Sequence, residues 1–276
     1  MNIVFFGSSS FVSQKLVENL SKKKNTIFFS RSKKYSITSN NFDLTSSKKI
    51  FSKLKIKKID YLFFFSSYVP KSERKSKWVN CRDVNILGLV NFIKQIKIPI
   101  KKIILSSSCS VYGENRFKYY NENSIAYPES YYAISKFAQE NIFRVFCEKN
   151  KIDFLCYRLG YVFGKNIYNK RLVKKIILNT KKKKIKIFNK KLNLNLIHTT
   201  QVSDFILSTY KKAKGIYNLT FKYKTSIKDF YNYTSKNIKN FKKNYNNYSP
   251  KKLLKLLPNK KYKSFYTYID IFKNEI

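Results

Sequence analysis

The N-terminal segment most constrains the fold of this chain. Residues Asn2 to Phe6 form a short apolar run, and Gly7-Ser8-Ser9-Ser10 interrupts it. Apolar residues then return at helical spacing, at Phe11, Val12, Leu16 and Leu20. A strand, a tight loop and a helix in this order place backbone N–H groups and a helix N-terminus where they can bind a phosphate. The segment therefore predicts the first strand and helix of a phosphate-binding α/β unit.

Strands and helices continue to alternate along the chain. We expect further strands at Ile27–Phe29, Asp60–Phe65, Lys101–Leu105, Asp153–Leu159, Ile185–Phe188 and Gly215–Leu219. We expect helices at Ser47–Lys55, Val79–Lys97, Ser130–Lys149, Lys170–Leu178 and Val202–Lys212. Such alternation is typical of a doubly wound parallel sheet with helices on both faces, an α/β fold. The tail from Lys222 is rich in Lys, Tyr and Asn, and it can be helical or partly disordered.

The charge is strongly basic, at a formal +43. Such an excess usually suggests a nucleic-acid partner. Here the lysines are spread along the whole chain together with many Asn, Ile, Phe and Tyr residues, which share A/T-rich codons. We therefore interpret the charge as a compositional bias and expect no specific nucleic-acid partner. A basic nucleic-acid-binding protein stays open as an alternative.

The cysteine and histidine contents indicate a cytoplasmic protein without a metal site. The four cysteines form no C-x-x-C pair and read as reduced thiols: Cys81, Cys109, Cys147 and Cys156. The single histidine, His198, argues against a histidine-rich metal site. We see no secretory signal, and the longest apolar run, Tyr61 to Phe65, is too short to span a bilayer. We expect no membrane partner.

Tyr132 and Lys136 form a candidate acid–base pair. Four residues apart in a predicted helix, they lie on one face, one turn apart. A lysine ammonium beside a phenol favours the phenolate and lowers the tyrosine pKa from about 10. Such a tyrosine can exchange a proton with a hydroxyl or carbonyl near neutral pH. The spacing alone carries no weight, because composition predicts roughly four Tyr-x-x-x-Lys pairs and the chain has four.

Eight short motifs give this pair a context. They are Gly7-Ser8-Ser9-Ser10-Phe11-Val12-Ser13, Asp43-Leu44, Ser66-Ser67, Asn85-Ile86-Leu87-Gly88, Ser107-Ser108-Cys109-Ser110-Val111-Tyr112-Gly113, Tyr132-Ala133-Ile134-Ser135-Lys136, Arg158-Leu159-Gly160-Tyr161-Val162-Phe163-Gly164 and Leu196-Ile197-His198-Thr199-Thr200-Gln201. Their order and predicted elements resemble the extended short-chain dehydrogenase/reductase family, the NAD(P)-dependent nucleotide-sugar epimerases and dehydratases. The resemblance covers roughly residues 1–220. It implies a Rossmann domain of residues 1–164 plus about 196–221, and a small substrate lobe of about 165–195 and 222–276.

The resemblance also implies which residues act. Tyr132 would exchange a proton with a sugar hydroxyl or keto oxygen, Ser108 would hydrogen-bond the same oxygen, and Lys136 would lower the tyrosine pKa and bind the nicotinamide ribose. The cofactor, NADP or NAD, would be bound by Gly7, Ser10, Phe11, Val12, Arg31, Asp43, Leu44, Ser66, Ser67, Asn85, Tyr132 and Lys136. Ser110 and Tyr161 stand at substrate positions.

The chain departs from the family pattern at several places. Ser10 and Ser13 replace two loop glycines, and a Cβ at Ser10 can crowd the pyrophosphate. Ser30 stands where NAD-preferring members carry Asp, and Arg31 follows it, which favours NADP. The arginine that binds the substrate diphosphate is missing, with Leu194 or Asn195 in its place. Ser-Cys-Ser replaces the dehydratase Thr-Asp-Glu triplet, which argues against 4,6-dehydration.

The resemblance implies an NAD(P)-dependent oxidoreductase or epimerase that acts on a nucleotide-activated sugar in bacterial surface-polysaccharide synthesis. It also implies a homodimer, formed through the helices Val79–Lys97 and Ser130–Lys149. The lost glycines and the missing arginine motivate a second hypothesis. In it the chain is a non-catalytic Rossmann-fold member that binds NAD(P) without turnover.

Overall fold

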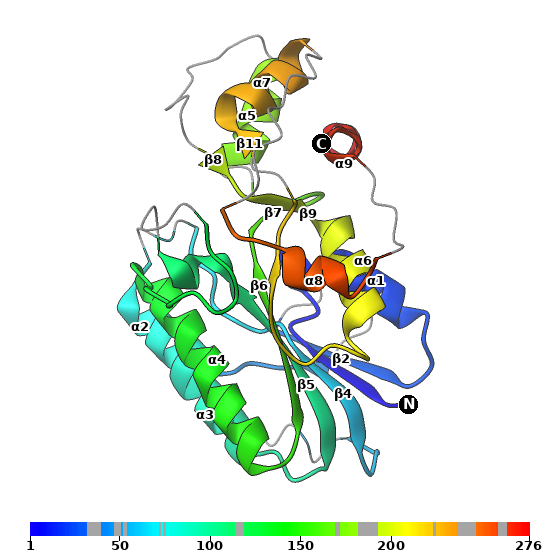
Figure 1. Cartoon of the computed structure of the whole chain (residues 1–276). Coiled ribbons are helices and arrows are strands. Elements are labelled where there is room, and N and C mark those ends of the chain that lie inside the picture. The colour runs from blue at the N-terminus through cyan, green and yellow to red at the C-terminus, as the bar shows by residue number, and fades with distance from the viewer. Residues whose placement is uncertain are drawn as a thin grey trace.

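A seven-stranded parallel sheet forms the centre of the molecule (Figure 1). The structure is a computed structural model that describes residues 1–31, 40–46, 51, 54–71, 73, 76–113, 119–168, 172–181, 193–222, 225–236, 247–258 and 264–276. The strands are β1 (Ile3–Phe6), β2 (Thr26–Ser30), β3 (Asn40–Asn41), β4 (Ile59–Phe64), β5 (Ile100–Ser108), β6 (Asp153–Leu159) and β10 (Gly215–Leu219). Their order is β10-β6-β5-β4-β1-β2-β3, so the direction of winding reverses between β1 and β4. The predicted doubly wound sheet is confirmed.

The central strands are apolar because both of their faces are covered. Residues on β1 alternate between two cores, with Ile3 and Phe5 on one face of the sheet and Val4 and Phe6 on the other. All four side chains are fully buried. A strand buried on both faces reads as a continuous apolar run rather than as an alternating one, which explains why the sequence identified these strands readily.

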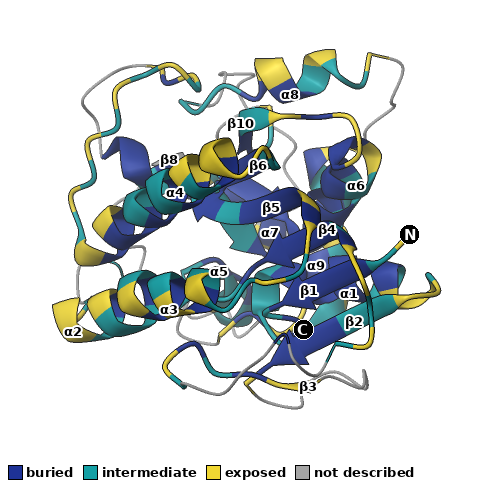
Figure 2. Ribbon diagram, turned by 90° about the horizontal axis from the view of Figure 1, so that it is seen from below, coloured by how far each residue is buried: buried dark blue, intermediate teal, exposed yellow. Residues whose placement is uncertain are grey.

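Helices cover both faces of the sheet (Figure 2). On one face α1 (Gln14–Ser21) packs beside α6 (Thr199–Thr209). On the other face lie α2 (Trp78–Asn80), α3 (Gly88–Lys94) and α4 (Tyr131–Lys149). Ser130 caps α4 by accepting a hydrogen bond from the backbone N–H of Ala133 at 3.1 Å.

The helix predicted over Val79–Lys97 is interrupted. Between α2 and α3 the residues Cys81–Leu87 form a π-helix, and the helix ends at Lys94. Within this wider segment Asn85 is fully buried and bonds the backbone of Tyr68. A π-helix is a costly local geometry that often marks a functional site. Here it accompanies an inward-facing amide, which apolar periodicity cannot reveal.

The structure extends or leaves untested several other predicted elements. Strand β5 runs past the predicted end at Leu105, because Ser106, Ser107 and Ser108 stay in register with β6. Most of the predicted helix Ser47–Lys55 and the whole predicted strand Ile185–Phe188 lie outside the described residues. Among the residues that are described, no helix is both long enough and apolar enough to cross a membrane.

A second, smaller core lies above the sheet. It contains side chains from β7 (Tyr161–Phe163), β9 (Leu196–His198), α5 (Leu172–Lys181), α7 (Ile227–Lys236) and α9 (Phe265–Glu275). The strands β8 (Asn193–Leu194) and β11 (Thr225–Ser226) pair antiparallel in the same region (Figure 1). Of these elements, α5, α7, α9, β8 and β11 come from the two segments that the sequence assigned to the substrate lobe, whereas β7 and β9 come from the segments that it assigned to the Rossmann domain.

One segment of the expected lobe lies elsewhere, which corrects the predicted boundary. Helix α8 (Lys251–Lys255) contacts β10, and its buried Leu253 joins the core on the α1 and α6 face of the main sheet. Just before it, the ring of Tyr248 stacks on that of Tyr112, with ring centroids 5.6 Å apart. Leucines at helical spacing predict an apolar helix face, but the spacing does not indicate which of the two cores that face covers.

His198 has a structural environment. It is fully buried, and its Nδ1 accepts a hydrogen bond from the backbone N–H of Thr200 at 3.2 Å, which caps α6. Its Nε2 lies 3.5 Å from a carboxylate oxygen of Glu275 on α9. The imidazole also stacks on the ring of Tyr268. These contacts join α9 to β9.

Candidate active site

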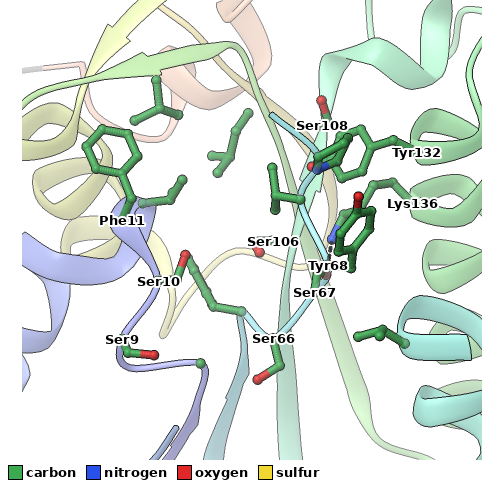
Figure 3. A pocket seen from close by; sticks show the side chains of 18 of the residues that line it. Ser9, Ser10, Phe11, Ser66, Ser67, Tyr68, Ser106, Ser108, Tyr132 and Lys136 are labelled. Atoms are coloured by element: carbon green, nitrogen blue, oxygen red, sulfur yellow. Dashed lines mark hydrogen bonds between the residues drawn. The ribbon is translucent and has the colours of Figure 1, made fainter. Parts of the chain in front are cut away.

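A cavity of about 670 Å³ opens where the winding of the sheet reverses, beyond the carboxyl ends of the central strands. Most of the residues predicted to act line it: Gly7, Ser10, Phe11, Val12, Arg31, Asp43, Leu44, Ser66, Ser67, Ser108, Tyr132, Lys136 and Tyr161. Figure 3 shows Ser9, Ser10 and Phe11 on one side of the cavity and Ser108, Tyr132 and Lys136 on the other. The lining does not include Asn85 or Ser110.

The loop after β1 needs its glycine at one position. Gly7 has a φ of +91°, a conformation that side chains rarely adopt. A Cβ on Gly7 would lie 2.6 Å from the carbonyl carbon of Phe65, at the end of the neighbouring strand. Gly7 therefore allows the loop to cross closely over the residues that follow β4.

The two serines that replace glycines fit the loop. Ser10 has φ −67° and ψ 138°, an ordinary extended conformation that does not require glycine. Ser13 is fully buried, and its hydroxyl lies within hydrogen-bond distance of the carbonyl oxygens of Gly7, at 2.9 Å, and Ser10, at 3.0 Å. The hydroxyl thus ties the two ends of the loop together. Ser10 lines the cavity, so its Cβ is the feature that a phosphate bound there would meet.

Ser108 is the last residue of β5, and hydrogen bonds from Ser110 orient its hydroxyl group. The backbone N–H of Ser110 donates to the Ser108 Oγ at 3.2 Å, and the Ser110 hydroxyl donates to it at 2.9 Å. A hydroxyl has two acceptor lone pairs and one proton to donate. With both lone pairs engaged, Ser108 is prepared to donate its proton to an oxygen in the cavity. Ser110, which was expected to contact substrate, bonds Ser108 and does not line the cavity.

Lys136 is a buried lysine beside the cavity. Its Nζ donates to the Ser67 Oγ at 2.9 Å and to the Gln139 Oε1 at 2.7 Å. Burial disfavours the charged form and lowers the pKa of Lys136 to about 8, against smaller opposing effects of Cys156 and Glu140. The amine can therefore change its protonation state close to neutral pH.

A buried ion pair anchors the helix that carries Tyr132 and Lys136. Glu140 on α4 accepts from Arg158 on β6, with Oε2 2.7 Å from Nη2 and Oε1 3.0 Å from Nε. The Ser107 hydroxyl on β5 donates to the same carboxylate at 2.5 Å. The guanidinium also lies over the ring of Tyr112, 4.8 Å from its centroid. One carboxylate thus joins α4 to two strands.

Asn85 organises the loop after β4 from behind the cavity. Its Oδ1 accepts from the backbone N–H of Tyr68 at 2.7 Å, and its Nδ2 donates to the Tyr68 carbonyl at 3.1 Å. The same Nδ2 lies 2.9 Å from the hydroxyl of Ser135 on α4. Asn85, which was expected to contact the cofactor, does not line the cavity itself, and its amide supports Tyr68, which does.

Arg31, Asp43 and Leu44 line the cavity from the loops after β2 and β3. Hydrogen bonds from the backbone N–H and the hydroxyl of Thr45 lower the pKa of Asp43, and the nearby Arg31 lowers it further, while burial opposes them. Gly88 packs closely here, since a Cβ on it would lie 2.9 Å from the Cβ of Leu44. Ser30 is buried and does not line the cavity.

Sequence reasoning missed several residues of the site. Tyr68, Lys71, Asn166 and Tyr168 line the cavity from loops that carry no recognisable motif. Gln139 carries a detectable signal, because it stands three residues after Lys136 and so shares its side of a helix. Its contact with Ser67, 72 residues away in the chain, carries no such signal.

Comparisons with known proteins show which chains this one is similar to. The family model of the NAD dependent epimerase/dehydratase family matches residues 3–219. UDP-glucose 4-epimerase of Mycoplasma genitalium is 27% identical over 111 residues, 38% of this chain and 32% of that protein. Human dTDP-D-glucose 4,6-dehydratase is 29% identical over 151 residues, 52% of this chain and 43% of that protein. The chain thus matches less than half of the length of each of these relatives.

The fold matches solved structures over its whole length. The crystal structure of Thermus thermophilus UDP-glucose 4-epimerase in complex with NAD has a TM-score of 0.82 and 16% sequence identity. The match covers 100% of this chain and 98% of that one. This likeness confirms the α/β architecture that the sequence predicted.

We predict that breaking the buried ion pair destabilises the protein strongly. Arg158→Met leaves the Glu140 carboxylate buried without its cation, so the free energy of unfolding should fall by about 3–5 kcal/mol. Chemical denaturation measures the loss. A double variant, Glu140→Gln with Arg158→Met, should recover part of it, because no unpaired charge is then buried.

A second ion pair on the same helix is a matched control. Arg144 and Glu148 are exposed, with Nη1 and Oε2 3.5 Å apart. Arg144→Met should therefore change the free energy of unfolding by less than about 1 kcal/mol. Equal losses from Arg144→Met and Arg158→Met would contradict the anchoring role of the buried pair.

Proposed function

Because the chain belongs to the NAD dependent epimerase/dehydratase family, one of the extended short-chain dehydrogenases/reductases, we propose that it is an NAD(P)-dependent enzyme that epimerises or reduces a nucleotide-activated sugar. One observation carries the proposal. Ser108, Tyr132 and Lys136 come from β5 and α4 to the same wall of one cavity, opposite the loop that follows β1 (Figure 3). The matched relatives, by their names, act on UDP-glucose and dTDP-D-glucose.

The residues present fit a dinucleotide. Arg31 and Asp43 line the cavity after β2 and β3, and Lys136 lines it from α4. Gly7 allows the loop after β1 to pass close to Phe65. In this proposal Ser9, Ser10 and Phe11 hold the pyrophosphate and Lys136 holds the nicotinamide ribose. A bound nicotinamide supplies the hydride acceptor and donor.

The residues of the opposite wall would move the proton. Tyr132 takes a proton from the sugar hydroxyl during oxidation and returns it to the keto oxygen during reduction. Ser108 donates its directed hydroxyl proton to the same oxygen and holds it in place. The charge of Lys136 favours the phenolate of Tyr132. Ser110 assists indirectly, by orienting Ser108.

Within the family we favour epimerisation or reduction over 4,6-dehydration. Elimination of water calls for an additional acid and base near the sugar. The residues after the second serine of β5 are Ser108, Cys109 and Ser110, none of them a carboxylic acid. Burial raises the pKa of the Cys109 thiol well above its usual value, which makes it unsuitable as a base.

Tyr132→Phe tests the enzyme. Removing the phenolic hydroxyl removes the proton carrier, so turnover of a UDP- or dTDP-sugar should fall by at least about 100-fold. Binding of NAD(P), measured by fluorescence titration, should stay nearly unchanged. Tyr131→Phe is the matched control, because Tyr131 is the neighbouring tyrosine and is half exposed, at 50%; it should leave turnover unchanged.

The outcomes separate the two hypotheses that the family admits. Unchanged turnover in Tyr132→Phe contradicts the assigned role. NAD(P) binding by the native protein without turnover of any nucleotide sugar identifies a non-catalytic member. Mass spectrometry of nucleotide sugars that co-purify with the protein then names the sugar.

We also propose that the protein prefers NADP to NAD. Arg31 lines the cavity directly after β2, and the buried Ser30 offers no carboxylate to a ribose 2′-hydroxyl. Arg31→Ala should weaken NADP(H) binding by about 10- to 100-fold, the value of a charge-assisted contact to a phosphate. NAD(H) binding should change little. An equal loss of affinity for NADP(H) and NAD(H) in Arg31→Ala, measured by calorimetry, refutes this preference.

A homodimer through the α2–α4 face is part of the proposal. Several large apolar side chains are exposed on these helices: Trp78, Val79, Leu87, Ile134 and Val145. Val145→Lys should convert a dimer to a monomer in light scattering, because it buries an unpaired charge in the interface. Ile125→Lys is the control, since Ile125 is more exposed but lies off these helices. A native monomer, or no change in Val145→Lys, refutes the dimer.

A further inference from the structure

Gln139 is a neutral side chain buried at the centre of the site. It is fully buried, and its Oε1 accepts two hydrogen bonds, from the Lys136 Nζ at 2.7 Å and the Ser67 Oγ at 3.1 Å. Lys136 also donates to the Ser67 Oγ at 2.9 Å. The three polar groups therefore form a closed triangle that links α4 to the residues after β4.

This triangle decides where the ammonium can point. An ammonium has three N–H donors, and among the described residues Gln139 and Ser67 take two of them. Lys136 also lines the cavity, so the remaining donor is available there. A long, flexible lysine side chain loses this orientation without such acceptors.

The charges around Lys136 make the neutrality of Gln139 significant. On α4 the nearest carboxylate is Glu140, and Arg158 and Ser107 engage it. On β6 burial raises the pKa of the Cys156 thiol well above its usual value, so that thiol stays neutral. Other titratable residues line the cavity with Lys136, among them Tyr132 on α4 and Tyr68, Lys71 and Glu73 after β4, and Cys81 lies near Ser135.

We propose that Gln139 is a positioning residue that orients Lys136 toward the cavity and, by being neutral, leaves the lysine charge available to stabilise the phenolate of Tyr132. The inference rests on the proposed function only where it invokes Tyr132. A glutamate at this place would make the same hydrogen bonds, but it would also cancel the charge of Lys136.

Two substitutions of Gln139 have opposite consequences. Gln139→Glu places a negative charge within hydrogen-bond distance of the Lys136 ammonium. This charge stabilises the charged lysine and raises the pKa of Lys136. Gln139→Leu keeps the approximate volume but removes the acceptor, which lowers the pKa of Lys136 further. A side chain that merely filled space would not move this pKa in opposite directions.

The first readout needs no turnover. Carbon-13 NMR of protein labelled at the lysine Cε reports the titration of each amine, and Lys136→Met identifies the signal of Lys136. That signal should titrate near pH 8 in the native protein. The pH midpoint of this titration should rise by about 1–3 units in Gln139→Glu, and it should fall below the native value in Gln139→Leu. Asn141→Asp adds the same charge to α4 away from Lys136 and should leave the signal unchanged.

The second readout is the pH profile of kcat/KM. Cancelling the lysine charge raises the pKa of Tyr132, so the acid limb should move to higher pH in Gln139→Glu. In Gln139→Leu the lysine loses its proton at lower pH, so the alkaline limb should move to lower pH. Both shifts should be absent in Asn141→Asp.

The outcomes separate this inference from the proposed function. If Lys136 titrates as expected in the variants but the native protein turns over no sugar, the positioning of Lys136 is supported and the enzyme is not. An unchanged Lys136 titration in Gln139→Leu overturns the inference, whatever the activity. If Gln139→Leu does not fold, Ser67→Ala takes its place, because it also removes an acceptor of Lys136, and it must lower the pKa of Lys136; failure to do so overturns the inference.

Discussion

The buried contact of Glu140 with Arg158 is the constraint on which the site depends. Its carboxylate binds the guanidinium of β6 and the Ser107 hydroxyl of β5, while it sits on α4 one turn after Lys136. Taking both charges out of water is costly, so such a pair is retained where it specifies an arrangement rather than where it adds stability. Here it specifies where α4 lies against the ends of β5 and β6. Tyr132 and Ser108 meet at one wall because this contact holds both elements.

The same contact keeps the carboxylate of Glu140 from pairing with the ammonium of Lys136. Arg158 and Ser107 engage Glu140, which stands next to Gln139, while Lys136 is bonded by two neutral groups. The buried thiols of Cys109 and Cys156 have pKa values raised by desolvation and add no anion. An uncompensated ammonium at low dielectric acts strongly on a nearby phenol, because burial weakens screening by water. The lowered pKa of Lys136 is the cost of this arrangement.

The loop after β1 shows that two glycines of a motif can be replaced when their conformations are ordinary. Ser10 is extended, and Ser13 binds the loop carbonyls with its hydroxyl. Only Gly7 has the positive φ and the close approach to Phe65 that exclude a side chain. The lost glycines therefore weigh less against cofactor binding than the motif alone indicates.

Local patterns sufficed to predict the alternating strands and helices of a doubly wound sheet, because periodicity within each segment shows them directly. The choice of Ser108, Tyr132 and Lys136 came from the resemblance of ordered motifs to a family, since the Tyr-x-x-x-Lys spacing alone carries no weight; the structure places all three in the lining of one cavity. The folded structure alone decided that Asn85 supports Tyr68, that Ser110 directs Ser108, that α8 joins the main core and that Gln139 holds Lys136. The contact of Asn85 with Tyr68 and the packing of α8 join residues that are far apart in the chain. The contacts of Ser110 with Ser108 and of Gln139 with Lys136 are local, and they depend on rotamers and burial. Such contacts leave no periodic trace, because they are made by the packing of whole elements.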